Sequence, residues 1–230
     1  MEENSSNSPY LRQIRSFVRR EGRLTEGQQR ALAELLPRFG VPAEGPLDLT
    51  ALFGRAAPTV LEIGFGNGDS LAQMAQAQPD WNYLGVEVHR PGVGHLLLLL
   101  ERETIDNVRV VCDDAQLLLA RLADDSLQGV QLYFPDPWHK KRHHKRRLVQ
   151  PEWAQTIRCK LAVGGFLHMA TDWENYAEHM REVLDAASGF RPATADEAAA
   201  RIGARPQTKF ERRGLKRGHG VWDLVYIRAS

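Results

Sequence analysis

The sequence predicts an α/β fold with a mostly parallel sheet, and two observations lead to this prediction. From Thr59 to about residue 187, short apolar segments typical of buried strands alternate with longer segments of helical periodicity. Several short segments run into glycine-rich or acidic loops, which is typical of the carboxyl edge of a parallel sheet, where ligands bind. The alternation indicates βαβ units with helices on both faces of the sheet.

The predicted elements follow one another in a regular order. The strands are TVLEIG (59–64), NYLGVEV (82–88), VRVVC (108–112), GVQLYF (129–134) and GFLHMAT (165–171). The helices cover residues 69–78, 92–104, 115–123, 151–162 and 173–187. Pro91 suits the first turn of the second helix. Thr171 and Glu174 have capping-box spacing for the last helix, which Gly189 ends.

The ends of the chain are less regular than its middle. The alanine-rich segment 193–204 fits either a short helix or a flexible loop, and KFERRG (209–214) and VWDLVYIR (221–228) resemble a closing pair of antiparallel strands. The N-terminal region starts polar, continues with arginine-rich helical signals and ends in a linker rich in proline and glycine. We therefore expect a disordered tail (1–10), a basic helical arm with its linker (11–57) and the main domain (58–230).

Charge and cysteine content limit the class of protein. The chain has 30 Lys and Arg against 29 Asp and Glu, but basic residues gather near residues 12–23, 140–147 and 205–217. Such clusters on a nearly neutral chain indicate a polyanionic partner. Two distant cysteines without CxxC spacing argue against a disulfide framework and fit a reducing compartment. No apolar run approaches the length of a membrane span and the N-terminus is polar, so we expect a cytoplasmic protein without a membrane segment.

The glycine-rich turn after the first strand fits a ligand site. Gly64, Gly66 and Gly68 would let a ligand approach backbone amides between this strand and the next helix. A dinucleotide fingerprint would place its third glycine where Asp69 stands, and that carboxylate would repel a pyrophosphate. S-adenosylmethionine (SAM) has no phosphate and carries a cationic sulfonium, so an acidic pocket suits it. A tight structural turn is the alternative explanation.

Acidic residues at three successive strand ends support the SAM interpretation. Glu62 ends the first strand, and Glu87 ends the second, where it could grip ribose hydroxyls. Asp113 or Asp114 follows the third strand, near the expected adenine. Each acid alone also fits a solvated loop, but parallel strands bring all three to one edge of the sheet.

The segment FPDPWHKKRHHKRR (134–147) joins a rigid acid to a dense basic run. Asp136 lies between Pro135 and Pro137, which fix φ on either side and limit the directions of its side chain. Trp138 offers a face for stacking a nucleobase, and the basic run can contact phosphates. A proline turn followed by a solvated loop is the alternative, although six Lys and Arg in eight residues repel one another unless an anion is bound.

The histidines do not indicate a metal site. His139 and His143 have i, i+4 spacing, but no third ligand accompanies them and the surrounding charge is positive. His168 lies inside a predicted strand and fits a core or edge histidine better than a catalytic one. We therefore expect no metal.

Together these segments resemble bacterial tRNA (guanine-N7-)-methyltransferases, which methylate a guanine in the variable loop of tRNA. The resembling segments are LEIGFGNG (61–68), GVEVHRPGVG (85–94), FPDPWHKKRHHKRR (134–147), HMATDWENYAEHM (168–180), RPQTKFERRG (205–214) and GHGVWDL (218–224). The resemblance implies a Rossmann-like, doubly wound, seven-stranded sheet with an antiparallel closing strand. It also implies SAM as methyl donor, tRNA position 46 as target, and neither a metal nor an obligatory protein partner.

The resemblance carries roles to particular residues. The implied SAM-binding residues are Glu62, Gly64, Gly66, Gly68, Glu87, Asp114 and Asp136, and Asp136 is also the implied catalytic residue. The implied contacts to tRNA or its guanine are Lys140, Asp172, Thr208, Lys209, Phe210 and Glu211. Asp172 has a second explanation, because acids are favoured at helix N-termini. Thr208, Lys209 and Glu211 also fit cross-strand surface pairs.

Two other classes of function stay open at this point. A non-catalytic RNA-binding protein would keep the basic run without needing Glu62, Glu87 and Asp114. An NAD-dependent oxidoreductase would need the glycine that Asp69 replaces. For methyl transfer, guanine N7 is already an unprotonated lone pair, so Asp136 would orient and stabilise rather than act as a general base.

Overall fold

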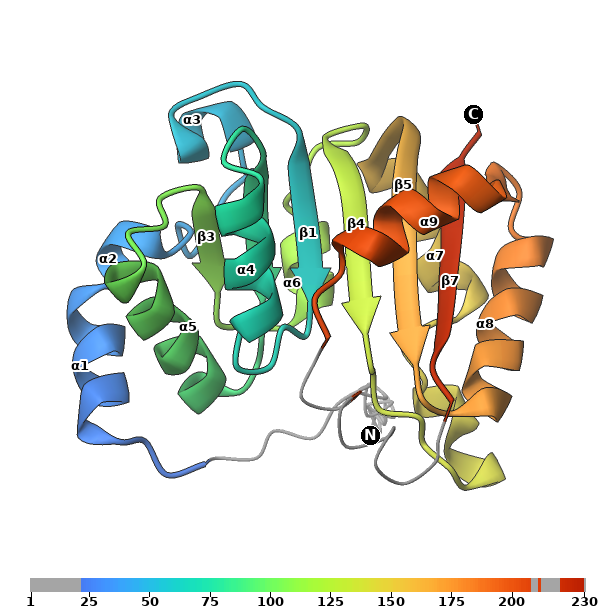
Figure 1. The fold of residues 1–230 in the computed structure, drawn as a ribbon, viewed down its shortest axis with the longest axis horizontal. Helices are drawn as coiled ribbons and strands as arrows, with labels where there is room; N and C mark the ends of the chain where they lie inside the picture. The colour runs from blue at the N-terminus through green and yellow to red at the C-terminus, as the bar shows by residue number, and fades with distance from the viewer. Residues whose placement is uncertain (1–21, 208–210, 212–219, 230) are drawn as a thin grey trace, which may run out of the picture.

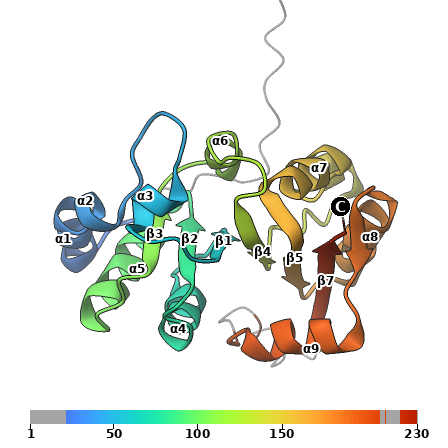
Figure 2. The same ribbon diagram turned by 90° about the horizontal axis from the view of Figure 1, so that it is seen from above.

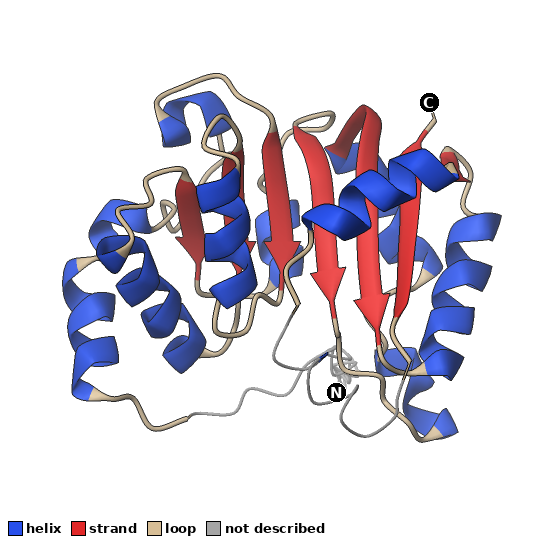
Figure 3. Cartoon of the chain, in the orientation of Figure 1, coloured by secondary structure: helices blue, strands red, loops and turns tan. Residues whose placement is uncertain are grey.

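The computed structural model describes residues 22–207, 211 and 220–229, and its centre is one seven-stranded sheet (Figure 1, Figure 3). The strands are β1 (Thr59–Ile63), β2 (Asn82–Val86), β3 (Val108–Val111), β4 (Leu127–Tyr133), β5 (Leu161–Thr171), β6 (Phe190–Pro192) and β7 (Trp222–Arg228). Their spatial order is β3-β2-β1-β4-β5-β7-β6. β1 to β5 are parallel to one another, whereas β7 runs antiparallel to both β5 and β6. The predicted doubly wound sheet with an antiparallel closing strand is confirmed.

Helices cover both faces of this sheet. They are α1 (Glu26–Glu34), α2 (Leu36–Phe39), α3 (Leu49–Phe53), α4 (Asp69–Ala77), α5 (Arg90–Arg102), α6 (Ala115–Leu119), α7 (Pro151–Lys160), α8 (Glu174–Ala186) and α9 (Ala195–Ala204). α4, α5 and α9 lie on one face, and α6, α7 and α8 lie on the other (Figure 2). An apolar cluster fills each layer, one around Leu71 and Leu97 and the other around Leu118 and Tyr176. The strands of the centre are buried on both faces, which explains their continuous apolar sequence.

The strand and helix predictions from Thr59 onward are largely confirmed, with differences at element ends. The helix expected to reach residue 162 ends at Lys160, because Leu161 takes an extended conformation and begins β5. α6 ends at Leu119, short of the predicted residue 123. The ambiguous alanine-rich segment is helix α9, which Thr194 starts with a capping box.

One predicted detail, at the start of α8, was wrong. Thr171 does not cap α8, because it remains in β5 opposite Trp222, and the N-cap is Trp173. The closing strand β7 pairs with β5 and β6, and the predicted pairing of β7 with the segment KFERRG falls outside the described residues. Of that segment only Glu211 lies within the described residues, and it is in no strand.

The described part of the N-terminal region packs on the main sheet layer. A capping box between Thr25 and Gln28 starts α1, and the Gln28 side chain donates a hydrogen bond to Pro91 O at 3.1 Å, at the start of α5. Gly40 forms an isolated bridge to Val110 of β3. The expected tail over residues 1–10 lies outside the described residues, and the division of the chain at residue 57 stays a prediction.

Candidate active site

The candidate site lies at the carboxyl edge of the sheet, where β1 and β4 are neighbours (Figure 1). From β1 the chain continues to β2 and β3 on one side, whereas β4 leads to β5 on the other. Such a switch point leaves a crevice beyond the strand ends, where ligands bind in open α/β sheets. Each of five parallel strands brings one candidate acid to this edge: Glu62, Glu87, Asp114, Asp136 and Asp172.

The glycine turn between β1 and α4 exposes its backbone. Gly64, Gly66 and Gly68 have φ of 74°, 61° and 80°, in the left-handed region that favours glycine. A Cβ built on Gly64 or Gly66 would meet nothing within 4 Å, so a ligand can approach the backbone there. A Cβ on Gly68 would lie 2.7 Å from Leu96, so this glycine has a packing requirement of its own.

Glu87 braces the glycine turn with both carboxylate oxygens. Oε2 accepts a hydrogen bond from the Gly66 N–H at 2.9 Å, and Oε1 accepts one from the His89 N–H at 2.9 Å. A carboxylate oxygen can accept more than one hydrogen bond. Glu87 can therefore shape the turn and accept hydrogen bonds from ligand hydroxyls at the same time.

Glu62 is a buried carboxyl group at the end of β1. The residue is 3% exposed, it lies between Gly85 of β2 and Gln131 of β4, and its Oε2 has no hydrogen-bond partner among the described residues. Burial, followed by the nearby Glu87 charge, raises the pKa of Glu62 to about 8. A cationic group beside this carboxyl would favour its ionised form, so the position suits the ammonium group of an amino-acid ligand.

The acids that follow β3 have local partners. Asp114 is the N-cap of α6, and its Oδ1 accepts a hydrogen bond from the Gln116 N–H at 2.9 Å. Asp113 Oδ1 accepts one from the Asp114 N–H at 2.8 Å. Capping therefore gives Asp114 a structural role, and it fixes the carboxylate at the expected adenine side of the edge.

The turn after β4 holds Asp136 in a strained backbone. Phe134 and Trp138, on either side of the Pro135–Pro137 segment, have φ of 52° and 44°, which is unfavourable for residues other than glycine. The Phe134 N–H donates a hydrogen bond to Ala170 O at 2.7 Å and so ties the turn to β5. Asp136 itself is exposed. Strained backbone of this kind is typical of functional sites.

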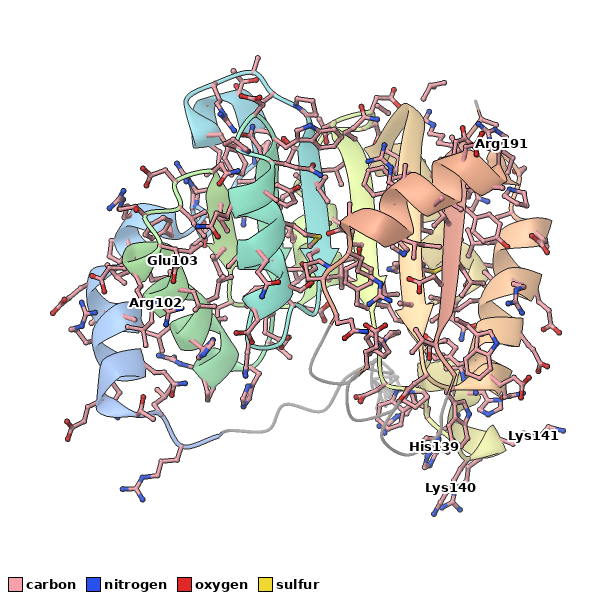
Figure 4. The ribbon with its side chains drawn as sticks, in the orientation of Figure 1. Arg102, Glu103, His139, Lys140, Lys141 and Arg191 are labelled. Carbon is pink, nitrogen blue, oxygen red and sulfur yellow. The ribbon has the colours of Figure 1, made fainter. Side chains whose placement is uncertain are left out.

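The basic run forms a short 3₁₀ helix, η1 (Lys141–Arg146), directly after this turn. Four of its cations are exposed: Lys140, Lys141, Arg142 and Lys145. Figure 4 shows Lys140 and Lys141 projecting away from the carboxyl edge of the sheet. Partial desolvation and the cations Arg142 and Arg146 lower the pKa of His143, so its ring is neutral near pH 7. The exposed positive charge therefore comes from Lys and Arg.

Two other residues of the motif have partners within the protein. Arg147 is buried, and its guanidinium donates hydrogen bonds to Pro137 O at 3.0 Å and to Asn175 Oδ1 at 2.8 Å. The phosphate contacts expected of the basic run therefore do not include Arg147. The Arg146 guanidinium carbon lies 4.7 Å from the centre of the Trp138 ring, and the His143 ring lies edge-on to that ring at 6.1 Å.

The remaining predicted substrate residues lie at β5 and near the C-terminus. Asp172 precedes the N-cap of α8 and forms no hydrogen bond or ion pair within the described part of the chain, so it is not a side-chain cap, although its charge lies at the helix N-terminus. Thr208, Lys209 and Phe210 lie outside the described residues. Glu211 is buried and ion-paired with Arg205 at 2.7 Å. The sequence counted Arg205 only within the basic cluster 205–217 and the resembling segment 205–214, and neither pattern gave it a role of its own.

These residues fit SAM better than a dinucleotide. The orphaned Glu62 oxygen suits an ammonium group, Glu87 can accept ribose hydroxyls, and Asp69 places negative charge in the first turn of α4. The described ranges contain no group of three or more His, Cys, Asp or Glu residues that could hold a metal. No helix in these ranges has the length and apolar composition to cross a bilayer.

The fold and this edge define a class I, Rossmann-like, SAM-dependent methyltransferase. A family model described as "Putative methyltransferase" matches residues 56–224. The solved 16S rRNA methyltransferase KamB has a TM-score of 0.59 at 13% identity, covering 81% of this chain and 96% of that one. An rRNA methylase from Streptococcus thermophilus has a TM-score of 0.52 at 14% identity, covering 83% and 100%. These two likenesses concern the fold alone.

Sequence comparison identifies the family within this class. A tRNA (guanine-N(7)-)-methyltransferase of Alkalilimnicola ehrlichii is 58% identical, covering 98% of this chain and 97% of the relative. Proteins of the same name from Alcanivorax borkumensis and Aeromonas hydrophila are 58% and 56% identical, covering 96% and 98% of this chain and 93% and 97% of their own. The chain belongs to the tRNA (guanine-N(7)-)-methyltransferase family, as its resembling segments predicted.

Proposed function

We propose that this protein transfers a methyl group from SAM to N7 of guanine 46 in the variable loop of tRNA. The observation that carries this proposal is the meeting of two kinds of group at one sheet edge. Acids and an open glycine turn end β1 to β3, and an exposed cationic helix follows the Asp136 turn after β4. The names of the relatives support the nucleobase, its atom and the RNA class.

The residues at β1 to β3 would hold SAM. Glu62 would bind the ammonium group, Glu87 the ribose hydroxyls and Asp114 the adenine side, with Gly64 and Gly66 leaving room at the backbone. When bound, SAM supplies an electrophilic methyl group for attack by guanine N7. Gly68 contributes by packing the start of α4 against Leu96.

Asp136 would act by orientation and electrostatics. Guanine N7 has no proton to lose, so the reaction requires alignment of the nucleophile and stabilisation of the positive charge that develops on the purine. A carboxylate can accept a hydrogen bond from the N1–H of guanine and stabilises that charge. The prolines and the strained residues Phe134 and Trp138 hold the Asp136 backbone before substrate arrives, which lowers the cost of alignment.

The exposed cations of η1 and its N-cap Lys140 would bind the tRNA backbone. Lys140 and Lys141 project from the edge that carries Asp136, and Arg142 and Lys145 are exposed in the same short helix, so these cations would contact phosphates beside the target nucleotide. Asp172 and residues 208–211 would complete the guanine side. We further propose that the chain acts in the cytoplasm without an obligatory protein partner.

The test is to incubate the full chain with an unmodified tRNA transcript and SAM and to analyse the nucleosides by mass. We expect 7-methylguanosine, and we expect it to disappear when guanine 46 of the transcript is replaced by adenine. Binding of tRNA and SAM without any methylated nucleoside would contradict the proposal, as would 7-methylguanosine formed at another position. Binding of a nicotinamide dinucleotide in place of SAM would point to an oxidoreductase instead.

A further inference from the structure

A buried ion-pair network lies behind the turn that carries Asp136, and its centre is Arg205. This residue follows α9, and its side chain is only 4% exposed. Its guanidinium forks between two carboxylates. Nη1 and Nη2 donate to the two oxygens of Glu211 at 2.7 and 3.1 Å, while Nε and Nη2 donate to the two oxygens of Asp223 at 2.9 and 3.0 Å. Arg205 therefore fixes the orientation of Glu211 against β7.

The network continues across the sheet to the end of β4. Asp223 Oδ1 lies 2.8 Å from His168 Nε2, and His168 Nδ1 lies 3.2 Å from the Tyr133 hydroxyl. Burial lowers the pKa of His168 despite the Asp223 charge, so a neutral ring donates from Nε2 and accepts from Tyr133 at Nδ1. The sequence-based expectation that His168 is a satisfied core or edge histidine is thereby confirmed.

Arg205 also contacts the residues that lead directly into the Asp136 turn. Its guanidinium carbon lies 5.6 Å from the centre of the Tyr133 ring and 5.9 Å from that of Phe134. Phe134 is the strained residue two positions before Asp136. The arginine thus joins two groups that the proposed function places at the guanine: the Asp136 turn through its aromatic residues, and Glu211 through the bidentate pair.

A buried fork of this kind costs desolvation and is not explained by stability alone. Replacing a buried ion pair by apolar residues is often neutral or stabilising, so its retention calls for another role. Bidentate Arg–carboxylate pairs fix geometry as well as charge, and each carboxylate oxygen can still accept a further hydrogen bond. Guanine presents its N2 amino group beside N1–H, so a second fixed carboxylate can accept from the amino group while Asp136 accepts from N1–H.

A similar ion pair joins β6 to the first turn of α9, and it is not buried. Arg191 and Glu197 are also six residues apart and also bidentate, with distances of 2.8 and 2.7 Å. Their side chains are 44% and 37% exposed, however. Figure 4 shows Arg191 at the opposite end of the sheet from Lys140. The spacing and the bidentate geometry are the same, whereas burial, position and the second carboxylate partner of Arg205, Asp223, differ.

We propose that Arg205 is a positioning residue that holds the Glu211 carboxylate beside the end of β4, where it accepts a hydrogen bond from the N2 amino group of the target guanine. The inference rests on the proposed methyl transfer to tRNA. It makes Arg205 a determinant of guanine specificity without contact to the reacting atoms. Lysine cannot replace it, because an ammonium group lacks the planar fork.

The test uses tRNA transcripts with guanosine or inosine at the methylated position, because inosine keeps N7 but lacks the N2 amino group. We expect wild type to favour guanosine by about tenfold or more in kcat/KM, the size of one hydrogen bond to a charged group. Arg205→Lys and Glu211→Gln should each reduce this ratio to about twofold or less. SAM affinity should stay within about twofold of wild type, because Glu62, Glu87 and Asp114 lie at the ends of β1 to β3, away from the Arg205 network. Arg191→Lys and Glu197→Gln are the matched controls and should keep both the ratio and the rate.

The alternative outcomes are distinguishable. The positioning role would be overturned if Arg205→Lys and Glu211→Gln kept the wild-type ratio of kcat/KM for the guanosine and inosine transcripts. It would also be overturned if the wild-type protein did not discriminate between the two transcripts. Loss of SAM binding in Arg205→Lys together with an unchanged ratio in Glu211→Gln would make Arg205 a folding residue and also overturn it. Absence of 7-methylguanosine from the guanosine transcript with wild type would instead overturn the proposed function itself.

Discussion

The two halves of the carboxyl edge are built differently. At the ends of β1 to β3, carboxylates are held by the protein's own backbone: Glu87 accepts two N–H groups and Asp114 caps a helix. At the ends of β4 and β5, the side chains of Lys140, Lys141 and Asp172 form no hydrogen bonds with the described residues. The rigid part of this half is the strained turn that carries Asp136.

The difference matches the two ligands that we propose. SAM is a small molecule of fixed shape, and a site for it gains from acceptors that are oriented before binding. A tRNA backbone is long and polyanionic, so exposed mobile cations can bind it without exact register. Only the reacting guanine needs a rigid frame, and the prolines beside Asp136 and the Arg205 fork behind it supply one. Variants of the two halves should therefore fail in different ways.

The largest expected effect is that of Asp136→Asn, which removes the charge and keeps the shape. We expect the rate of methyl transfer at saturating substrates to fall by about 10²- to 10³-fold, the range for losing one electrostatic stabiliser of the transition state. Single-turnover kinetics with labelled SAM measures it. Asp80→Asn, an exposed position in the loop before β2, serves as control. A rate near that of wild type would remove Asp136 from the mechanism.

Glu87→Gln should weaken the binding of SAM without weakening the binding of tRNA. The dissociation constant for SAM should rise about 10- to 100-fold, because the neutral amide loses charged hydrogen bonds to ligand and turn. The dissociation constant for tRNA should not change. Isothermal titration with each ligand measures both, with Glu103→Gln at the C-cap of α5 as control (Figure 4). An equal rise in the dissociation constants for SAM and tRNA would contradict the assignment of SAM binding to the ends of β1 to β3.

The RNA half should respond to salt. Replacing Lys140, Lys141 and Arg142 by glutamine should reduce the slope of log affinity for tRNA against log salt by about one for each phosphate that the protein no longer neutralises. SAM affinity should stay unchanged. Filter binding over a salt series measures the slope, and Arg102→Gln on the far side of the molecule is the control. An unchanged slope would mean that the run is only a solvated loop.

The smallest expected effect concerns pH and Glu62. Its pKa of about 8 in the folded protein lies above the ordinary value of 4.5, so the folded state binds the extra proton between these values. The corresponding stability is complete below pH 4.5 and is lost as the pH rises through 8. From pH 6 to 9 the melting temperature of the SAM-free protein should fall more in wild type than in Glu62→Gln, by about 2 to 4 °C per kcal/mol. Parallel melting curves would show that Glu62 does not titrate in this range.

The sequence predicted those parts of the site that follow from local pattern. Strand ends locate Glu62, Glu87 and Asp114, because parallel strands bring successive loops to one edge. Phe134 and Trp138 gave no sign of their positive φ, since nothing local distinguishes a strained aromatic residue from a relaxed one. Arg147 appeared as one more exposed cation, and only tertiary contacts show it buried beside Asn175.

The C-terminal region was the least predictable, for a related reason. The neighbours of β7 and the Arg205 fork depend on residues far apart in the chain, such as His168 and Asp223. Such pairings carry no periodic signal. Thr171 and Glu174 show the opposite error, in which a correct local spacing was overridden because Thr171 stays in its strand.

We propose separate roles for Glu87 in SAM binding, for the basic run in tRNA binding and for Asp136 in the transition state. The most direct test of these roles is the single-turnover rate at saturating SAM and saturating tRNA. Under these conditions Glu87→Gln and the Lys140/Lys141/Arg142 variant should recover to within about threefold of wild type, because their defects lie in binding. Asp136→Asn should remain slower by about 10² or more, because its defect lies in the transition state. Two results would contradict the account. One is an Asp136→Asn rate that returns to the wild-type rate at saturating SAM and tRNA. The other is a rate of Glu87→Gln or of the Lys140/Lys141/Arg142 variant that stays about as low as the Asp136→Asn rate under these conditions.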